Sequence, residues 1–164
     1  MSSDNFNLHE PEFQRIRDIL FKMQSELRAQ LVLLINRSGQ PIVISGAADN
    51  IDCTALASLA AANLAATDGL ANIVGEREFS VLVHQGRRRS LFISDLMKRF
   101  SLVLVFDASA SSGLVRYKCK RTTLLLEDVI RDFQRRIERT EPVMSIPQFS
   151  DEEIEELLGR EVID

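Results

Sequence analysis

The chain has 164 residues, the length of one ordinary domain, and its 45% hydrophobic and 27% charged residues exclude a disordered protein. The formal net charge of -4 and a pI of about 5.3 argue against a nucleic-acid-binding domain, which usually carries a basic surplus.

The sequence carries no sign of a secretory signal, a membrane span or a metal site. Asp4, Asn5 and Glu10 interrupt any apolar segment near the N-terminus, and apolar stretches elsewhere fall short of the roughly 20 residues that a membrane helix needs. Cys53 and Cys119 lie far apart and, with only two histidines, offer no zinc ligand set. We therefore expect a cytoplasmic protein with reduced cysteines, no metal and no direct membrane insertion.

The first elements predicted along the chain are a helix and a strand hairpin. Apolar residues spaced three and four apart predict a helix over Pro11–Arg28. A buried strand is predicted over Gln30–Ile35, because Leu31–Ile35 is an apolar run with no polar alternation, and Ile42–Ile44 follows as a second strand. Between them, Gly39 can adopt the positive φ that a tight turn requires. The two strands are expected to form a hairpin.

The next element is an alanine-rich helix, predicted from about Thr54 to Val74. Asp52 is placed as its N-cap and Gly75 as its C-cap. The larger apolar side chains of this helix are expected to pack on the sheet: Leu56, Leu59, Leu70 and Ile73. A second set of small residues recurs at helical spacing and lets another surface approach closely, so we favour an interface there over packing on the protein's own sheet: Ala61, Ala62, Ala65, Ala66 and Gly69.

Three strands and a long helix follow. The strands are predicted over Phe79–Val83, Ser90–Ile93 and Leu102–Phe106, and the last is fully apolar, so it should be central and covered on both faces. His84 begins a turn, and a helix is predicted from about Gly113 to Glu138.

The order of elements defines the fold class and the domains. Strands in runs joined by tight turns predict α+β layers, with a five-stranded, mainly antiparallel sheet and helices on its faces, and not a doubly wound nucleotide-binding fold. Residues 1–139 are expected to form this domain. Residues 140–164 are expected to form a linker containing Pro142 and Pro147, followed by a short helix.

The predicted terminal helix is acidic and amphipathic. Ser150 and Glu153 make a capping box at its start, and residues 151–164 hold seven acids against one arginine. An apolar stripe on such a tethered helix suits a groove on a partner, although docking on its own domain is an equal alternative. The candidate contact residues of this segment are Phe149, Ile154, Leu157 and Leu158.

The sequence contains no recognisable catalytic or nucleotide-binding motif. No phosphate-binding glycine loop is present. His84 is interpreted as a surface histidine rather than a base, and Asp49 and Asp52 as a loop residue and a helix cap rather than paired carboxylates. The basic run Arg87–Arg89 is interpreted as a solvated hairpin tip, with contact to a phosphate or acidic partner, or an arginine finger, as alternatives. We predict no active site and no cofactor.

Four segments carry a family resemblance: NIDCTALASLAAANLAA, EREFSVLVHQG, SLVLVFD and SSGLVRYKCKRTT. Together with the order of elements, they resemble the roadblock family of dynein light chains and GTPase regulators. Within that family the chain is most similar to the bacterial MglB proteins, which pair with the Ras-like GTPase MglA in cell polarity and gliding motility. The similarity spans about Pro11–Glu138.

The resemblance implies a homodimer with a sheet continuous across both subunits, two copies of which bind one small Ras-like GTPase. It implies stimulation of GTP hydrolysis through the GTPase's own switch regions, without an arginine finger. It places Ala65 and Gly69 at the GTPase, and Asp68 departs from the small residue usual there. It also implies that Ile154 and Leu157 dock at a second site and affect nucleotide exchange. The alternative is a roadblock scaffold that only tethers partners.

Overall fold

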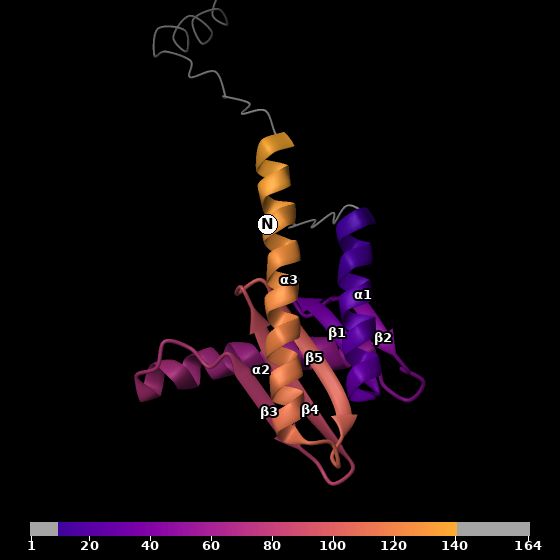
Figure 1. The fold of residues 1–164 in the computed structure, drawn as a ribbon. Coiled ribbons are helices and arrows are strands. Elements are labelled where there is room, and N and C mark those ends of the chain that lie inside the picture. Colours follow the sequence, from indigo (N-terminus) through magenta and orange to yellow (C-terminus); the bar gives the residue numbers. More distant parts are fainter. Residues whose placement is uncertain (1–9, 141–164) are drawn as a thin grey trace, which may run out of the picture. The chain divides into compact units, whose positions relative to one another are not determined.

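The computed structural model describes residues 10–140, which form three helices and a five-stranded sheet (Figure 1). The elements, in chain order, are α1 (Glu10–Leu27), β1 (Leu31–Asn36), β2 (Pro41–Gly46), α2 (Cys53–Val74), β3 (Val81–Gln85), β4 (Arg89–Leu96), β5 (Phe100–Asp107) and α3 (Ser112–Thr140). The strand order is β2-β1-β5-β4-β3, and every neighbouring pair is antiparallel. The predicted α+β class with an antiparallel sheet is confirmed.

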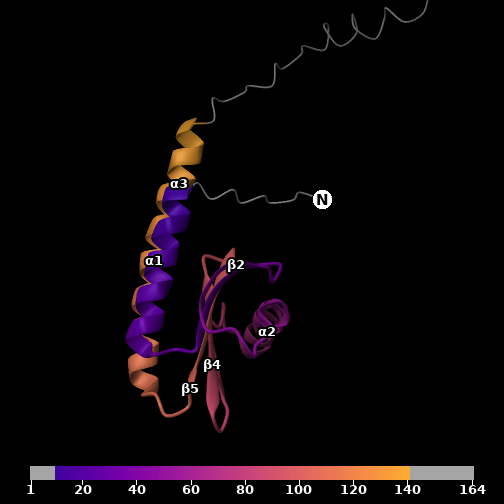
Figure 2. The same ribbon diagram turned by 90° about the vertical axis from the view of Figure 1, so that its right-hand side faces the viewer.

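The chain divides into two units, Met1–Phe133 and Gln134–Asp164. The sheet and the helices that pack on it lie in the first unit. There, α1 and the first part of α3 cover one face of the sheet, and α2 covers the other (Figure 2). None of the helices in residues 10–140 combines the length and the apolar composition of a membrane span.

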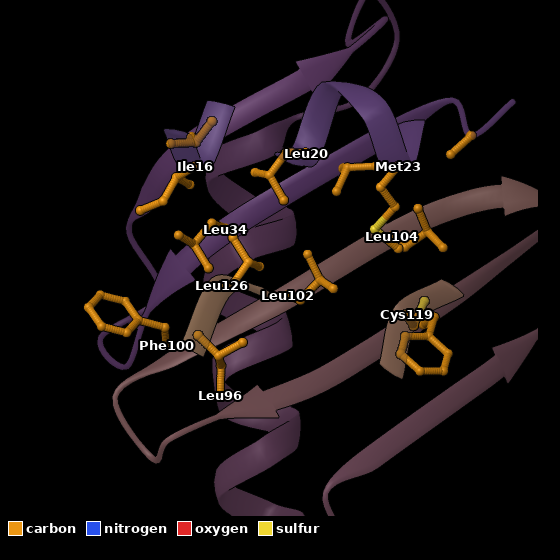
Figure 3. Close-up of a cluster of buried hydrophobic side chains, with 14 of the residues drawn as sticks. Ile16, Leu20, Met23, Leu34, Leu96, Phe100, Leu102, Leu104, Cys119 and Leu126 are labelled. Atoms are coloured by element: carbon orange, nitrogen blue, oxygen red, sulfur yellow. The ribbon is translucent and has the colours of Figure 1, made fainter. Parts of the chain in front are cut away.

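The central strands β1 and β5 separate two apolar clusters. The larger cluster fills the space under α1 and α3, where Leu20 and Met23 meet Leu34, Leu102 and Leu104 (Figure 3). The smaller cluster lies under α2. Every residue of β5 from Phe100 to Phe106 is buried, because successive side chains point to opposite faces and both faces are covered. This confirms the prediction of a central strand.

The helix ends follow from capping chemistry. The Asp52 side chain accepts a hydrogen bond from the Ala55 amide at 2.9 Å, and Gly75 adopts φ 77°, so both predicted caps of α2 are confirmed. The predicted boundaries of the third strand were less accurate. The strand begins at Val81, not Phe79, and it includes His84, which we had assigned to a turn.

Candidate partner-binding surface

Helix α2 packs on the sheet mainly through its smallest side chains. The residues buried along its length are Ala57, Ala60, Thr67 and Ala71. The helix also lies close to the β1–β2 turn: a Cβ on Gly39 would come within 2.8 Å of the Ser58 Cα. Small side chains therefore permit a short distance between α2 and the sheet.

This arrangement corrects the predicted packing of the large residues of α2. Leu56 is half-buried against the cluster under α2, as expected, but Leu59, Leu70 and Ile73 are 64%, 57% and 82% exposed. These three side chains project away from the sheet because the helix is rotated to place alanines against it. The prediction that they pack on the protein's own sheet was wrong.

The same rotation exposes most of the predicted small-residue surface. Ala61 is half-buried and packs against the cluster under α2. The other four residues are exposed: Ala62, Ala65, Ala66 and Gly69. Apart from its chain neighbours and the backbone of its own helix, no atom of residues 10–140 lies within 4 Å of the position that a Cβ on Gly69 would occupy. We call these four residues the small face; its role as a binding surface stays a prediction.

A second exposed surface joins the end of α2 to the sheet edge. The C-terminal half of α2, which carries Leu70, Ile73 and Val74, extends beyond the β3 edge of the sheet (Figure 1). Within residues 10–140, β3 pairs only with β4, so its other edge is open there, and Val81 and Val83 on it are each 37% exposed. Exposed apolar side chains beside an open strand edge are typical of an interface.

A group of charged side chains gathers where α2 passes the end of the sheet. The Lys98 ammonium lies 2.9 Å from Glu78, 3.4 Å from Asp95 and 3.5 Å from Asp68. Arg37 lies 3.5 Å from Asp68. The hydrogen bond to Glu78, followed by the nearby charges of Asp95 and Asp68, raises the pKa of Lys98, so its ammonium stays charged at neutral pH.

This charge group borders a small cavity beside the small face. The cavity has a volume of about 70 Å³, and its lining includes Ala61, Leu64 and Ala65 of α2 and every member of the charge group except Glu78. Sequence reasoning missed the group, because Asp68 and Lys98 are 30 residues apart and nothing in the sequence indicates that they meet. Only the packing of α2 across the sheet brings them together.

The residues weighed for catalysis occupy ordinary structural positions. Asp52 caps α2, Asp49 is exposed in the preceding loop, and His84 is exposed on β3. Both cysteines are free thiols. Burial raises the pKa of Cys119 to about 12, so this thiol is protonated at neutral pH. Within residues 10–140 no three His, Cys, Asp or Glu side chains gather as a metal site.

Four further predicted contact residues belong to the C-terminal segment. Phe149, Ile154, Leu157 and Leu158 lie outside the described residues. The basic residues Arg87–Arg89 are described and are all exposed at the β3–β4 hairpin.

Comparison with known proteins agrees with this architecture. Residues 16–106 match the family model of the Roadblock/LC7 domain. No curated protein matches the chain. Among solved structures, the chain is similar to Myxococcus xanthus MglB, with 37% identity and a TM-score of 0.72 over 76% of this chain and 94% of that one.

Two further solved structures are similar over the same share of the chain. The gliding protein MglB of Thermus thermophilus is 33% identical, with a TM-score of 0.72 over 76% of this chain and 95% of that one. An MglB with a tetrameric arrangement is also 33% identical, with a TM-score of 0.72 over 76% and 94% of the two chains.

Proposed function

Because the chain belongs to the Roadblock/LC7 domain family, we propose that it is a homodimeric regulator that binds a small Ras-like GTPase of the MglA type and stimulates its GTP hydrolysis. The observation that carries this proposal is the exposed small face on α2. Because Ala65 and Gly69 are small and exposed, a protein partner can come close to the backbone of α2, which is itself packed on the sheet. Two copies of the chain would bind one GTPase.

The open β3 edge and the projecting end of α2 support the homodimer. Antiparallel pairing of β3 with the β3 of a second copy would satisfy the free backbone groups of both edges. In the same arrangement, Leu70, Ile73 and Val74 of each copy would be covered by the other copy. The sheet would then run through both subunits. The small face lies in the turns of α2 that precede Leu70 and Ile73, on the side that Ile73 shares, and it would stay accessible there.

The proposed mechanism needs no catalytic group from this protein. The dimer would bind and reorganise the switch regions of the GTPase, whose own residues carry out hydrolysis. The C-terminal segment would bind at a second site on the GTPase and modulate nucleotide exchange, with contacts from Phe149, Ile154, Leu157 and Leu158. Because the chain is similar to MglB proteins, we propose that it acts in bacterial cell polarity and motility. It would do so in the cytoplasm, with recruitment to a cell pole.

Single-turnover GTP hydrolysis by an MglA-type GTPase, measured with and without the full chain, tests this function. We expect the hydrolysis rate to rise with the concentration of the chain until it saturates at two copies per GTPase. Binding without any rise in rate would contradict stimulation and would instead support a scaffold that only tethers partners.

Replacement of Arg87, Arg88 and Arg89 together by alanine is expected to leave the maximal hydrolysis rate unchanged. The three residues lie on an exposed hairpin, so their loss should weaken association modestly and in a salt-dependent way. The measurement is the single-turnover rate at saturating protein, at low and at physiological salt. A loss of about 10³-fold in that rate would instead identify an arginine finger.

A further inference from the structure

The C-terminal half of α2 has little apolar packing of its own on the sheet. Between Ala65 and Val74, only Thr67 and Ala71 are buried, and both are small. The large side chains in this stretch point away from the sheet. Since stability rises with the apolar area that is buried, this half of the helix should open more readily than the half that carries Ala57 and Ala60.

Ion pairs connect this half of α2 to the end of the sheet. Asp68 is the acidic residue of this stretch, and its two carboxylate oxygens face two different cations: Arg37 Nη2 at 3.5 Å and Lys98 Nζ at 3.5 Å. Arg37 lies in the β1–β2 turn and Lys98 in the β4–β5 turn, which lie at the same end of the sheet. One side chain of α2 is thereby tied to two separate hairpins.

The two cations are themselves held in place. Arg37 Nη1 donates a hydrogen bond of 3.0 Å to the Lys98 carbonyl. Lys98 lies in a turn where it and Met97 both adopt positive φ, at 58° and 56°, and its ammonium also bridges Glu78 and Asp95. An isolated exposed ion pair contributes little, but a network on a fixed turn loses less side-chain freedom when it forms.

We infer that Lys98 and Arg37 are positioning residues: through Asp68 they hold the C-terminal half of α2 on the end of the sheet and so keep Ala65 and Gly69 in the orientation that the partner binds. This inference rests on the proposed function for its effect on binding. Its effect on α2 itself can be measured in the protein alone.

The test compares Lys98→Met, which keeps the length of the side chain but removes its charge, with Lys98→Arg, which keeps the charge. Lys118→Met is the matched control, because Lys118 makes an ion pair of 2.6 Å with Glu26 on the opposite face of the sheet. Each full-length variant is examined by amide hydrogen exchange, by its thermal melt and by its affinity for the MglA-type GTPase.

In Lys98→Met we expect exchange over residues 65–74 to rise about fivefold and the GTPase affinity to fall by about the same factor, which corresponds to about 1 kcal/mol. Lys98→Arg should largely restore both, and Lys118→Met should change neither. The difference between wild type and Lys98→Met should shrink in high salt, where exposed charges are screened.

Three results would overturn the inference: unchanged exchange over residues 65–74 in Lys98→Met, the same increase in Lys118→Met, or faster exchange with undiminished GTPase affinity. Failure of the proposed function looks different. In that case the wild-type chain itself does not bind the GTPase, while the exchange experiment still shows whether Lys98 holds α2.

Discussion

Arginine at both Ala65 and Gly69 is expected to abolish GTPase binding while the dimer and its melting temperature stay near those of the wild type. The two positions are four residues apart, so the new side chains would project from the same face of α2. They would hold the GTPase surface away and bury charge without a partner, which costs several kcal/mol. Since each ~1.4 kcal/mol is tenfold in affinity, binding should fall below detection in a titration.

The structure explains why this variant should fold. Ala65 is exposed, and among residues 10–140 nothing beyond the backbone of its own helix and its chain neighbours stands within 4 Å of a Cβ at Gly69, so neither arginine overpacks the core. Replacing a glycine inside a helix also favours the helix by up to about 1 kcal/mol. Gln14→Arg with Ser25→Arg adds the same charge at exposed positions of α1 and should bind normally. A folded Ala65/Gly69 variant that still stimulates hydrolysis would exclude the small face as the binding surface.

Glutamate at both Leu70 and Ile73 is expected to convert the dimer into a monomer. In a single copy these side chains are 57% and 82% exposed, so their replacement should not disturb the core. In the proposed dimer the second copy covers them, and each buried carboxylate would lack a partner. Light scattering at micromolar concentration should therefore give a dimer for the wild type and a monomer for the variant.

Leu114→Glu with Tyr117→Glu provides a control at two other exposed, mainly apolar positions. These α3 residues are 48% and 55% exposed and lie on the other face of the sheet, so the variant should remain a dimer. A wild-type chain that is monomeric at micromolar concentration would contradict the homodimer. If instead the Leu70/Ile73 variant stays dimeric and fully folded, the dimer must form through another surface.

Local sequence signals predicted the elements well because the physical causes of these elements are themselves local. The Asp52 and Gly75 caps, the turn at Gly39 and the apolar run of β5 each act over a few residues. The third strand was predicted less accurately. This edge strand is mostly exposed, including Val81 and Val83, whereas β1 and β5 are buried almost throughout. Its ends are therefore not marked by a change from buried apolar to exposed polar residues.

The orientation of α2 could not be predicted in full from the sequence. Its apolar residues surround the helix, so periodicity does not indicate which side faces the sheet. Size was a misleading guide: Leu59, Leu70 and Ile73 were expected inside and are outside, and alanines occupy the inner face. The short separation at Gly39 and Ser58 selects small side chains there, and that separation is a property of the packed structure.

The sequence by itself determined the class of fold, the order and approximate ends of its elements, the presence of small residues on α2 and the resemblance to the roadblock family. These follow from periodicity, capping and short motifs, which depend on neighbours in the chain. Only the tertiary structure decided which side of α2 is free, that its end projects beyond β3, and that Arg37, Asp68 and Lys98 meet. Those features depend on the rotation and distance of one helix on a sheet, which are set by contacts between residues far apart in the chain.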